Sequence, residues 1–128
     1  MAHSSTMIGT DGLDRGSKPH PRAWGTYPRV LGKYVREEGV ISLENAIYKM
    51  THMPAAKFGI ANRGLVKEGY FADLVLFDPE TVIDRATYEN SRIGPAGMPH
   101  VIVNGKFAVK NGEQVGSRSG RALRRGQV

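Results

Sequence analysis

Two Asn-Gly dipeptides in the second half of the chain restrict its fold more than any other feature. Asn104-Gly105 separates the apolar run His100-Val-Ile-Val103 from Lys106-Phe-Ala-Val-Lys110, and Asn111-Gly112 follows directly. A type I′ hairpin turn needs a positive φ at both central residues, which Asn-Gly adopts readily. The sequence therefore predicts a three-stranded antiparallel meander in this part of the chain.

A further strand is predicted ahead of the meander. Residues 71–77 (Phe-Ala-Asp-Leu-Val-Leu-Phe) are nearly continuously apolar. This pattern is typical of a strand buried on both faces, with Asp73 as the exception. From Gly116 on, the chain is rich in arginine and poor in apolar residues, so we expect this tail to fray.

Helices are predicted over residues 26–59, in three pieces. Pro28 suits a first helical turn, and an apolar pattern of helical period follows it up to a stop at Gly39. Ser42 is the expected N-cap of a second helix, and Gly59 is expected to close a third, short turn of helix.

A short strand is predicted near the N-terminus, at residues 6–10 (Thr-Met-Ile-Gly-Thr), where it ends at Asp11-Gly12. A carboxylate at a strand end can point into a cleft and act as a general base or a metal ligand. Asp before Gly also commonly caps a turn, and the bare pattern favours that interpretation of Asp11.

The loop after Asp11 brings a cation close in sequence, because Arg22 follows Pro19-His-Pro. A guanidinium fork matches a carboxylate bidentately, so Arg22 is a candidate for orienting an acidic substrate. A solvated surface charge explains Arg22 equally well at this point.

The residue composition limits the cofactors that the chain can hold. The 128 residues include no cysteine, so a thiolate metal site or a disulfide within the chain is excluded. The four histidines (His3, His20, His52 and His100) are scattered and lack the close spacing of a metal site. A self-sufficient metal centre is therefore not expected in this chain.

The net charge of +6 favours an acidic ligand or partner. Two helices around Gly39 together with the arginine-rich tail leave a second hypothesis open, a non-catalytic basic module that binds a protein or nucleic acid. Its second helix, however, is predicted to present Glu44, Asn45, Tyr48 and Lys49 outward, which is no basic recognition face. Nucleic acid is therefore not the expected partner.

Nothing in the sequence has the pattern of a membrane span or a secretory leader. Residues 1–8 lack a basic start followed by a long apolar stretch, and no apolar run approaches the length of a span. The expected location is the cytoplasm.

Several motifs, in this order along nearly the whole chain, resemble the C-terminal part of the N-acyl-D-amino-acid deacylases (D-aminoacylases) of the amidohydrolase superfamily. They are Met7-Ile-Gly-Thr-Asp-Gly12, Pro19-His-Pro-Arg22, Trp24-Gly25-Thr26, Pro28-Arg-Val-Leu-Gly32, Val35-Arg-Glu-Glu-Gly39, Met50-Thr51, Pro54-Ala55, the run from Gly64 to Asp78, Val101-Ile-Val-Asn-Gly105 and Gly120-Arg121. The resemblance implies a metal-dependent hydrolase that converts N-acyl-D-amino acids to D-amino acids and carboxylates.

The resemblance also implies a fold and roles for the two candidate residues. The family combines a (β/α)8 barrel with a small β-sandwich, and Asp11 matches the aspartate that closes the last barrel strand and faces the metal. That aspartate takes a proton from metal-bound water and passes it to the leaving amine. Arg22 matches the arginine that binds the α-carboxylate of the substrate, while the segment from Gly64 to Leu74 is structural.

The family resemblance covers only about the last quarter of such an enzyme, because a barrel alone needs about 250 residues. We therefore expect an α+β chain that is a fragment of a longer enzyme. Residues 1–59 would be the end of the barrel, 60–116 the antiparallel strands of the sandwich, and 117–128 a basic tail.

The family's other metal ligands are missing from the chain, so zinc is expected in the full-length enzyme and not in this chain alone. The isolated chain is expected to be inactive, although Asp11 remains a possible metal ligand. Its exposed edges and faces are expected to be covered by the missing barrel half or by self-association.

Overall fold

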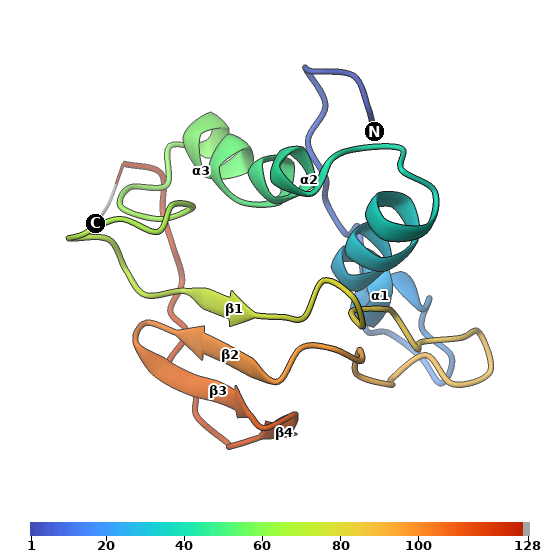
Figure 1. The fold of residues 1–128 in the computed structure, drawn as a ribbon. Coiled ribbons are helices and arrows are strands. Elements are labelled where there is room, and N and C mark those ends of the chain that lie inside the picture. Colours follow the sequence, from blue (N-terminus) through green and yellow to red (C-terminus); the bar gives the residue numbers. More distant parts are fainter. Residues whose placement is uncertain (127–128) are drawn as a thin grey trace.

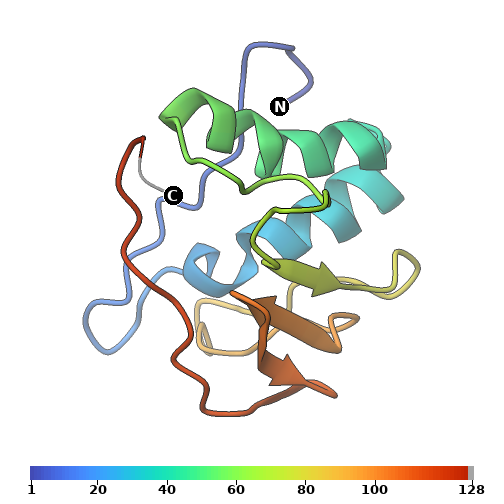
Figure 2. The same cartoon turned by 90° about the vertical axis from the view of Figure 1, so that its left-hand side faces the viewer.

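The computed structural model describes residues 1–126 as a group of helices followed by an antiparallel sheet, with the helices on one side of the sheet (Figures 1 and 2). The elements are α1 (Arg22–Arg29), the π-helix η1 (Val30–Glu37), α2 (Leu43–Met50), α3 (His52–Phe58), β1 (Leu74–Leu76), β2 (His100–Val103), β3 (Lys106–Lys110) and β4 (Glu113–Gln114). Within residues 1–126, no helix has the length and apolar character needed to cross a membrane. The α+β prediction is thereby confirmed at the level of its elements, and the domain boundaries at residues 59 and 116 remain predictions.

The first helix starts earlier than predicted, so that Pro28 lies in its interior and not in its first turn. Proline has no N–H and removes one helical hydrogen bond, yet the chain continues directly into η1. There the bonds reach five residues back, as the amide of Glu38 shows by donating to the carbonyl of Lys33 at 2.9 Å. The π-helix η1 ends at Glu37, and the φ of 61° at Gly39 confirms the predicted stop.

The second helix begins, and the third ends, as the local sequence predicts, although α3 starts at His52 and not at the predicted Pro54. Ser42 caps α2, because its side chain accepts a hydrogen bond from the amide of Asn45 at 3.3 Å. Gly59 ends α3 in the left-handed conformation, with a φ of 66°. Both features depend on hydrogen bonds and backbone angles within a few residues, which is why the sequence reveals them.

The core between the helices contains Val30, Ile41 and Ala46, with Ile8 and Met50 among the side chains packed against it. Lys49 was expected on the outer side of the second helix, but this prediction is wrong, because only 4% of Lys49 is exposed. Its ammonium group is buried among carbonyl oxygens and donates to those of His3 and Thr6. A buried charge is tolerated when such acceptors surround it.

The strand predicted at residues 6–10 is not formed in the described chain. The amide of Ile8 instead donates to the backbone oxygen of Lys49 at 3.2 Å, and the side chain of Lys49 holds Thr6. A strand needs a neighbouring strand for its ladder of hydrogen bonds, whereas a helix is the neighbour here. The N-terminal segment is therefore attached to α2.

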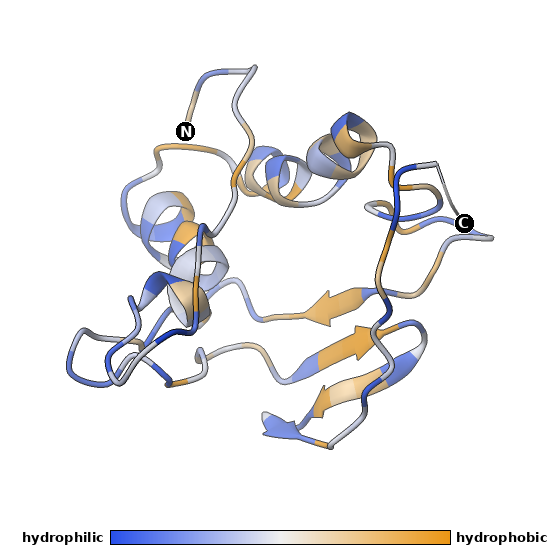
Figure 3. Ribbon diagram, turned by 180° about the vertical axis from the view of Figure 1, so that it is seen from behind, coloured by the Kyte–Doolittle hydropathy of each residue, from blue (hydrophilic) through white to orange (hydrophobic). Residues whose placement is uncertain are grey.

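The sheet has the order β1-β2-β3-β4, in which β2, β3 and β4 form the predicted three-stranded meander and β1 lies within the further strand predicted at residues 71–77. Both Asn-Gly turns are confirmed: φ is 48° at Asn104 and 77° at Gly105, and 54° at Asn111 and 81° at Gly112. Figure 3 shows β1, β2 and much of β3 as hydrophobic.

The strand predicted at residues 71–77 is shorter and more exposed than expected. Only β1 is formed, and the exposed fractions of Val75 and Leu76 are 50% and 48%. The prediction of burial on both faces is wrong, because β1 is at the edge of the sheet and pairs only with β2 within residues 1–126. A groove of about 640 Å³ lies between β1, α2 and the loop that carries Leu65 and Val66.

The arginine-rich tail does not fray as predicted but runs back along the molecule to the end of α3 (Figure 1). The side-chain amide of Asn104 donates to the backbone oxygen of Ser119 at 2.6 Å, and the amide of Gly126 donates to that of Gly59 at 3.0 Å. These long-range bonds fix a segment without regular secondary structure. The last two residues of the predicted tail, 127–128, lie outside the described residues.

A buried arginine joins the tail to the sheet. Arg63, whose side chain is only 8% exposed, forms an ion pair with Asp73 and donates to the Oδ1 atom of Asn104 at 2.6 Å. Its guanidinium lies 4.3 Å from the ring centre of Phe71, with Arg121 at 4.4 Å from the same ring. Burial and the nearby charge of Arg121 lower the pKa of Arg63 below its ordinary value.

Candidate functional site

A tight turn before the first helix presents Asp11 to solvent. Asp11 has a φ of 45°, and the amide of Gly12 donates to the hydroxyl of Thr10 at 3.2 Å. A Cβ atom on Gly12 would lie 2.7 Å from the Cα atom of Ala23, so only glycine fits against α1 here. The Asp11 side chain is 84% exposed.

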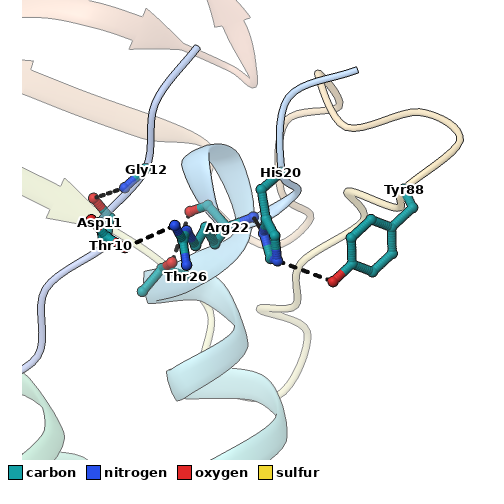
Figure 4. A network of polar contacts seen from close by, with 7 residues as sticks. All are labelled: Thr10, Asp11, Gly12, His20, Arg22, Thr26 and Tyr88. Carbon is teal, nitrogen blue, oxygen red and sulfur yellow. Dashed lines mark hydrogen bonds and ion pairs between the residues drawn. The ribbon is translucent and has the colours of Figure 1, made fainter. Parts of the chain in front are cut away.

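The structure brings Asp11 and Arg22, the two predicted site residues, into direct contact. The Nη2 atom of Arg22 lies 2.8 Å from the Oδ2 atom of Asp11, and Figure 4 shows the two side chains facing each other. The amide of the next residue, Gly12, is bound by the hydroxyl of Thr10, and the Asp11 carboxylate contacts Arg22. The carboxylate of Asp11 is thus directed at a cation and is open to water.

Two further residues surround Arg22, and the sequence did not single them out as functional. The Nδ1 atom of His20 accepts a hydrogen bond from the backbone amide of Arg22 at 3.0 Å, and its Nε2 atom lies 3.0 Å from the hydroxyl of Tyr88. The sequence offered one signal for His20, its place in Pro19-His-Pro-Arg22. For Tyr88, far away in the chain, it offered none.

Ion pairs fasten α1 and the preceding loop to the segment of residues 84–92. Arg29 pairs with Asp84 at 3.1 Å, and hydrogen bonds to Tyr34 and Asp84 raise the pKa of Arg29 above its ordinary value. Arg92 pairs with Asp14 at 2.7 Å. The segment of residues 84–92 therefore holds both the loop that carries Asp11 and the helix that carries Arg22.

A hollow of about 320 Å³ lies next to Arg22, between α1 and the segment of residues 84–92. Arg22, Arg29, Asp84 and Tyr88 are among its lining residues. Two guanidinium groups at one hollow suit a ligand with a carboxylate, since the fork of an arginine can donate two parallel hydrogen bonds to it.

The residues of this segment do not by themselves fit a zinc site. Within residues 1–126, no group of three histidine, cysteine, aspartate or glutamate side chains lies close enough to hold a metal ion. Asp11 is a single exposed carboxylate with Arg22 as its partner, and both ring nitrogens of His20 have hydrogen-bonding partners. A zinc site needs three or four ligands at one point, so further ligands must come from outside the described chain.

Comparison with known proteins identifies the family. The profile of the amidohydrolase family matches residues 3–109. The chain belongs to this family. This amidohydrolase segment is 50% identical over 125 residues to a D-aminoacylase of Alcaligenes xylosoxydans xylosoxydans. The aligned residues make up 98% of the segment and 26% of the relative. It is 49% identical over 123 residues to an N-acyl-D-glutamate deacylase from the same organism, and this alignment covers 96% of the segment and 25% of the relative.

Solved structures agree with this assignment. A crystal structure of D-aminoacylase matches the amidohydrolase segment with a TM-score of 0.90 and 52% identity, over 94% of the segment and 25% of that chain. A second match is an N-acyl-D-glutamate deacylase from Bordetella bronchiseptica, in complex with zinc and a phosphonate inhibitor that mimics the tetrahedral intermediate. Its TM-score is 0.81 and its identity 47%, over 84% of the segment and 23% of that chain. The segment spans about a quarter of the length of its relatives. The family resemblance predicted from the sequence is thereby confirmed.

Proposed function

We propose that this amidohydrolase segment is part of an enzyme that hydrolyses N-acyl-D-amino acids to D-amino acids and carboxylates. The observation that carries the proposal is the pairing of Asp11 with Arg22 in a segment about half identical to three such enzymes, which include an N-acyl-D-aspartate deacylase at 47% identity. The other three quarters of the enzyme would supply the zinc ligands, and zinc is the metal present in a related solved structure.

Arg22 is proposed to bind the α-carboxylate that all N-acyl-D-amino acids share. Its side chain is 44% exposed at the hollow beside α1, and only one of its nitrogens is used in the contact with Asp11. A guanidinium has five N–H donors, so it can hold a substrate carboxylate and remain near Asp11.

Asp11 is proposed to move the proton of the reaction. Its carboxylate would accept a proton from the attacking water and deliver it to the amide nitrogen as the C–N bond breaks, so that the amine leaves uncharged. The carboxylate is well exposed, and the contact with Arg22 places it beside the proposed binding point of the substrate. Zinc, when bound in the whole enzyme, would supply the activation of water and of the amide carbonyl.

We further propose that residues 6–10 become the last strand of a (β/α)8 barrel when the rest of the enzyme is present, and that the β-sheet belongs to a small β-sandwich. Two features support this: residues 6–10 have no neighbouring strand within residues 1–126, and β1 leaves one edge free there. The missing part would cover the groove between β1 and α2.

Binding of nucleic acid is supported less well. Arg22, Arg29, Arg36, Arg63 and Arg92 all form ion pairs with acidic side chains. A nucleic-acid interface needs such side chains free to contact phosphates. These five arginines are therefore engaged with acidic side chains of the chain itself.

A chimera tests the proposed function. The matching quarter of the Alcaligenes D-aminoacylase would be replaced by this chain, and the purified, zinc-loaded protein assayed with N-acyl-D-amino acids and their L-enantiomers. Release of D-amino acids, with the L-substrates left intact, is expected. A correctly folded, zinc-loaded chimera without such activity would contradict the proposal.

A further inference from the structure

The first helix begins at Arg22 without the usual cap. Its N-cap residue is Pro21, and no side-chain hydrogen bond comes from that residue. The amide of Arg22 is bound instead by the side chain of His20, two residues earlier, whose Nδ1 atom accepts from it at 3.0 Å. A neutral imidazole has one acceptor and one donor nitrogen, so this bond assigns the ring hydrogen to Nε2.

The donor nitrogen of His20 has a partner of its own. Nε2 lies 3.0 Å from the hydroxyl of Tyr88, and the two rings meet edge to face with centroids 5.1 Å apart (Figure 4). Tyr88 is part of a fastened turn, because the amide of Thr87 donates to the carbonyl of Asn90 at 3.1 Å. The orientation of the His20 ring is thus fixed from a segment far away in the sequence.

The backbone of Arg22 is held on both sides. His20 takes its amide, and the hydroxyl of Thr26 donates to its carbonyl at 2.7 Å. The side chain of Arg22 starts from a helix end, and uncapped helix ends fray. A small displacement of a group that binds the reacting molecule weakens binding and orientation strongly.

We propose that His20, oriented by Tyr88, is a positioning residue that fixes Arg22 for recognition of the substrate carboxylate. The proposal rests on the proposed function, in which Arg22 binds that carboxylate. His20 does not itself touch the substrate and acts through the amide of Arg22. A role in helix stability alone would affect all substrates alike, whereas positioning of Arg22 affects only substrates that carry the carboxylate.

The first experiment uses the 128-residue chain and needs no activity. Nitrogen NMR of the His20 ring should show the hydrogen on Nε2, and the Arg22 amide should exchange slowly with solvent. In His20→Ala this amide should exchange roughly 10-fold faster, as expected when one hydrogen bond is lost. His20→Asn should restore most of the protection, because an asparagine oxygen can accept from the amide two residues on. Unchanged exchange in His20→Ala would overturn the proposal.

The second experiment measures the zinc-loaded chimera with an N-acyl-D-amino acid and with its neutral α-amide analogue. His20→Ala should raise KM for the acid roughly 10-fold, the scale of one hydrogen bond, with kcat and the amide reaction nearly unchanged. His20→Asn should recover most of the loss, and Tyr88→Phe should raise KM by about 3-fold through its lost hydroxyl contact.

A matched control comes from the other histidine and tyrosine pair, Tyr48 and His52, whose ring centroids are 5.8 Å apart on α2 and α3. Tyr48→Phe removes a hydroxyl far from Arg22 and should leave KM unchanged. If His20→Ala raised KM equally for the acid and for its neutral α-amide analogue, the positioning role would be overturned. An inactive chimera would instead overturn the proposed function, while the exchange measurement would still decide whether His20 fixes Arg22.

Discussion

The region around Arg22 and the region around β1 satisfy their interactions in opposite ways. Beside Arg22, polar side chains find partners within the chain: Asp11 at 2.8 Å and, through the backbone, His20 at 3.0 Å. At β1, apolar side chains such as Val75 remain half exposed beside a strand edge that has no partner within residues 1–126. The comparison shows that the Asp11–Arg22 pair is formed within the segment itself, whereas part of the apolar surface at β1 is left uncovered within residues 1–126.

The largest expected effect concerns Asp11. In the chimera, Asp11→Asn should reduce kcat by roughly 10²-fold or more, the scale for loss of a general acid or base. Zinc content, measured by atomic emission, should stay largely intact. Asp14→Asn is the matched control, because Asp14 is an exposed carboxylate of the same loop that is also paired with an arginine, at 2.7 Å. A near-normal kcat in Asp11→Asn would leave Asp11 as a residue of the turn only.

The next effect separates Arg22 from an ordinary surface charge. Arg22→Lys should lower kcat/KM of the chimera for N-acyl-D-amino acids by on the order of 1.5–3 kcal/mol, because a lysine cannot reproduce the two parallel hydrogen bonds of the fork. The loss should largely vanish with the neutral α-amide substrate. Arg92→Lys, in the pair with Asp14, should not distinguish the two substrates. Equal losses of Arg22→Lys on both substrates would refute carboxylate binding.

A smaller effect is expected in the apolar region. The isolated chain should self-associate through β1, and Val75→Lys should weaken this association roughly 10-fold, because a charge on an edge strand opposes pairing. Sedimentation velocity over a range of concentrations would measure it. Leu13→Lys is the control, since Leu13 is 64% exposed in the other region. If the unchanged chain were monomeric, or if Val75→Lys and Leu13→Lys weakened association equally, β1 would not be the surface of self-association.

The smallest effect compares the two Asn-Gly turns. Asn104→Ala removes a left-handed turn residue together with side-chain bonds to Arg63 and Ser119, whereas Asn111→Ala removes a turn residue of similar φ. Urea unfolding should show Asn104→Ala to be less stable than Asn111→Ala by about 1–2 kcal/mol, the net value of the extra bonds. Equal stabilities would mean that the bonds of Asn104 contribute little.

The features that the sequence predicted correctly are determined within a few residues. The turns at Asn104 and Asn111, the cap at Ser42 and the ends at Gly39 and Gly59 all follow from local backbone chemistry. Asp11 and Arg22 were identified as candidates for the same reason, because each is part of a short motif.

The features that the sequence missed depend on partners that are distant in the chain. Lys49 is buried because the N-terminal segment supplies carbonyl oxygens, and the tail is ordered because Asn104 and Gly59 bind it. Tyr88 contacts His20 although the two residues are 68 positions apart in the sequence. Period and propensity carry no information on such contacts, so only the three-dimensional arrangement reveals them.

The close approach of Gly12 to α1 has a consequence for anyone who wishes to redesign this loop. The atom that a side chain at position 12 would meet first is the Cα of Ala23, which every residue at position 23 would also have. No exchange at position 23 can therefore compensate for a larger residue at position 12. A mutant library that aims at new acyl or side-chain preferences should therefore keep position 12 constant.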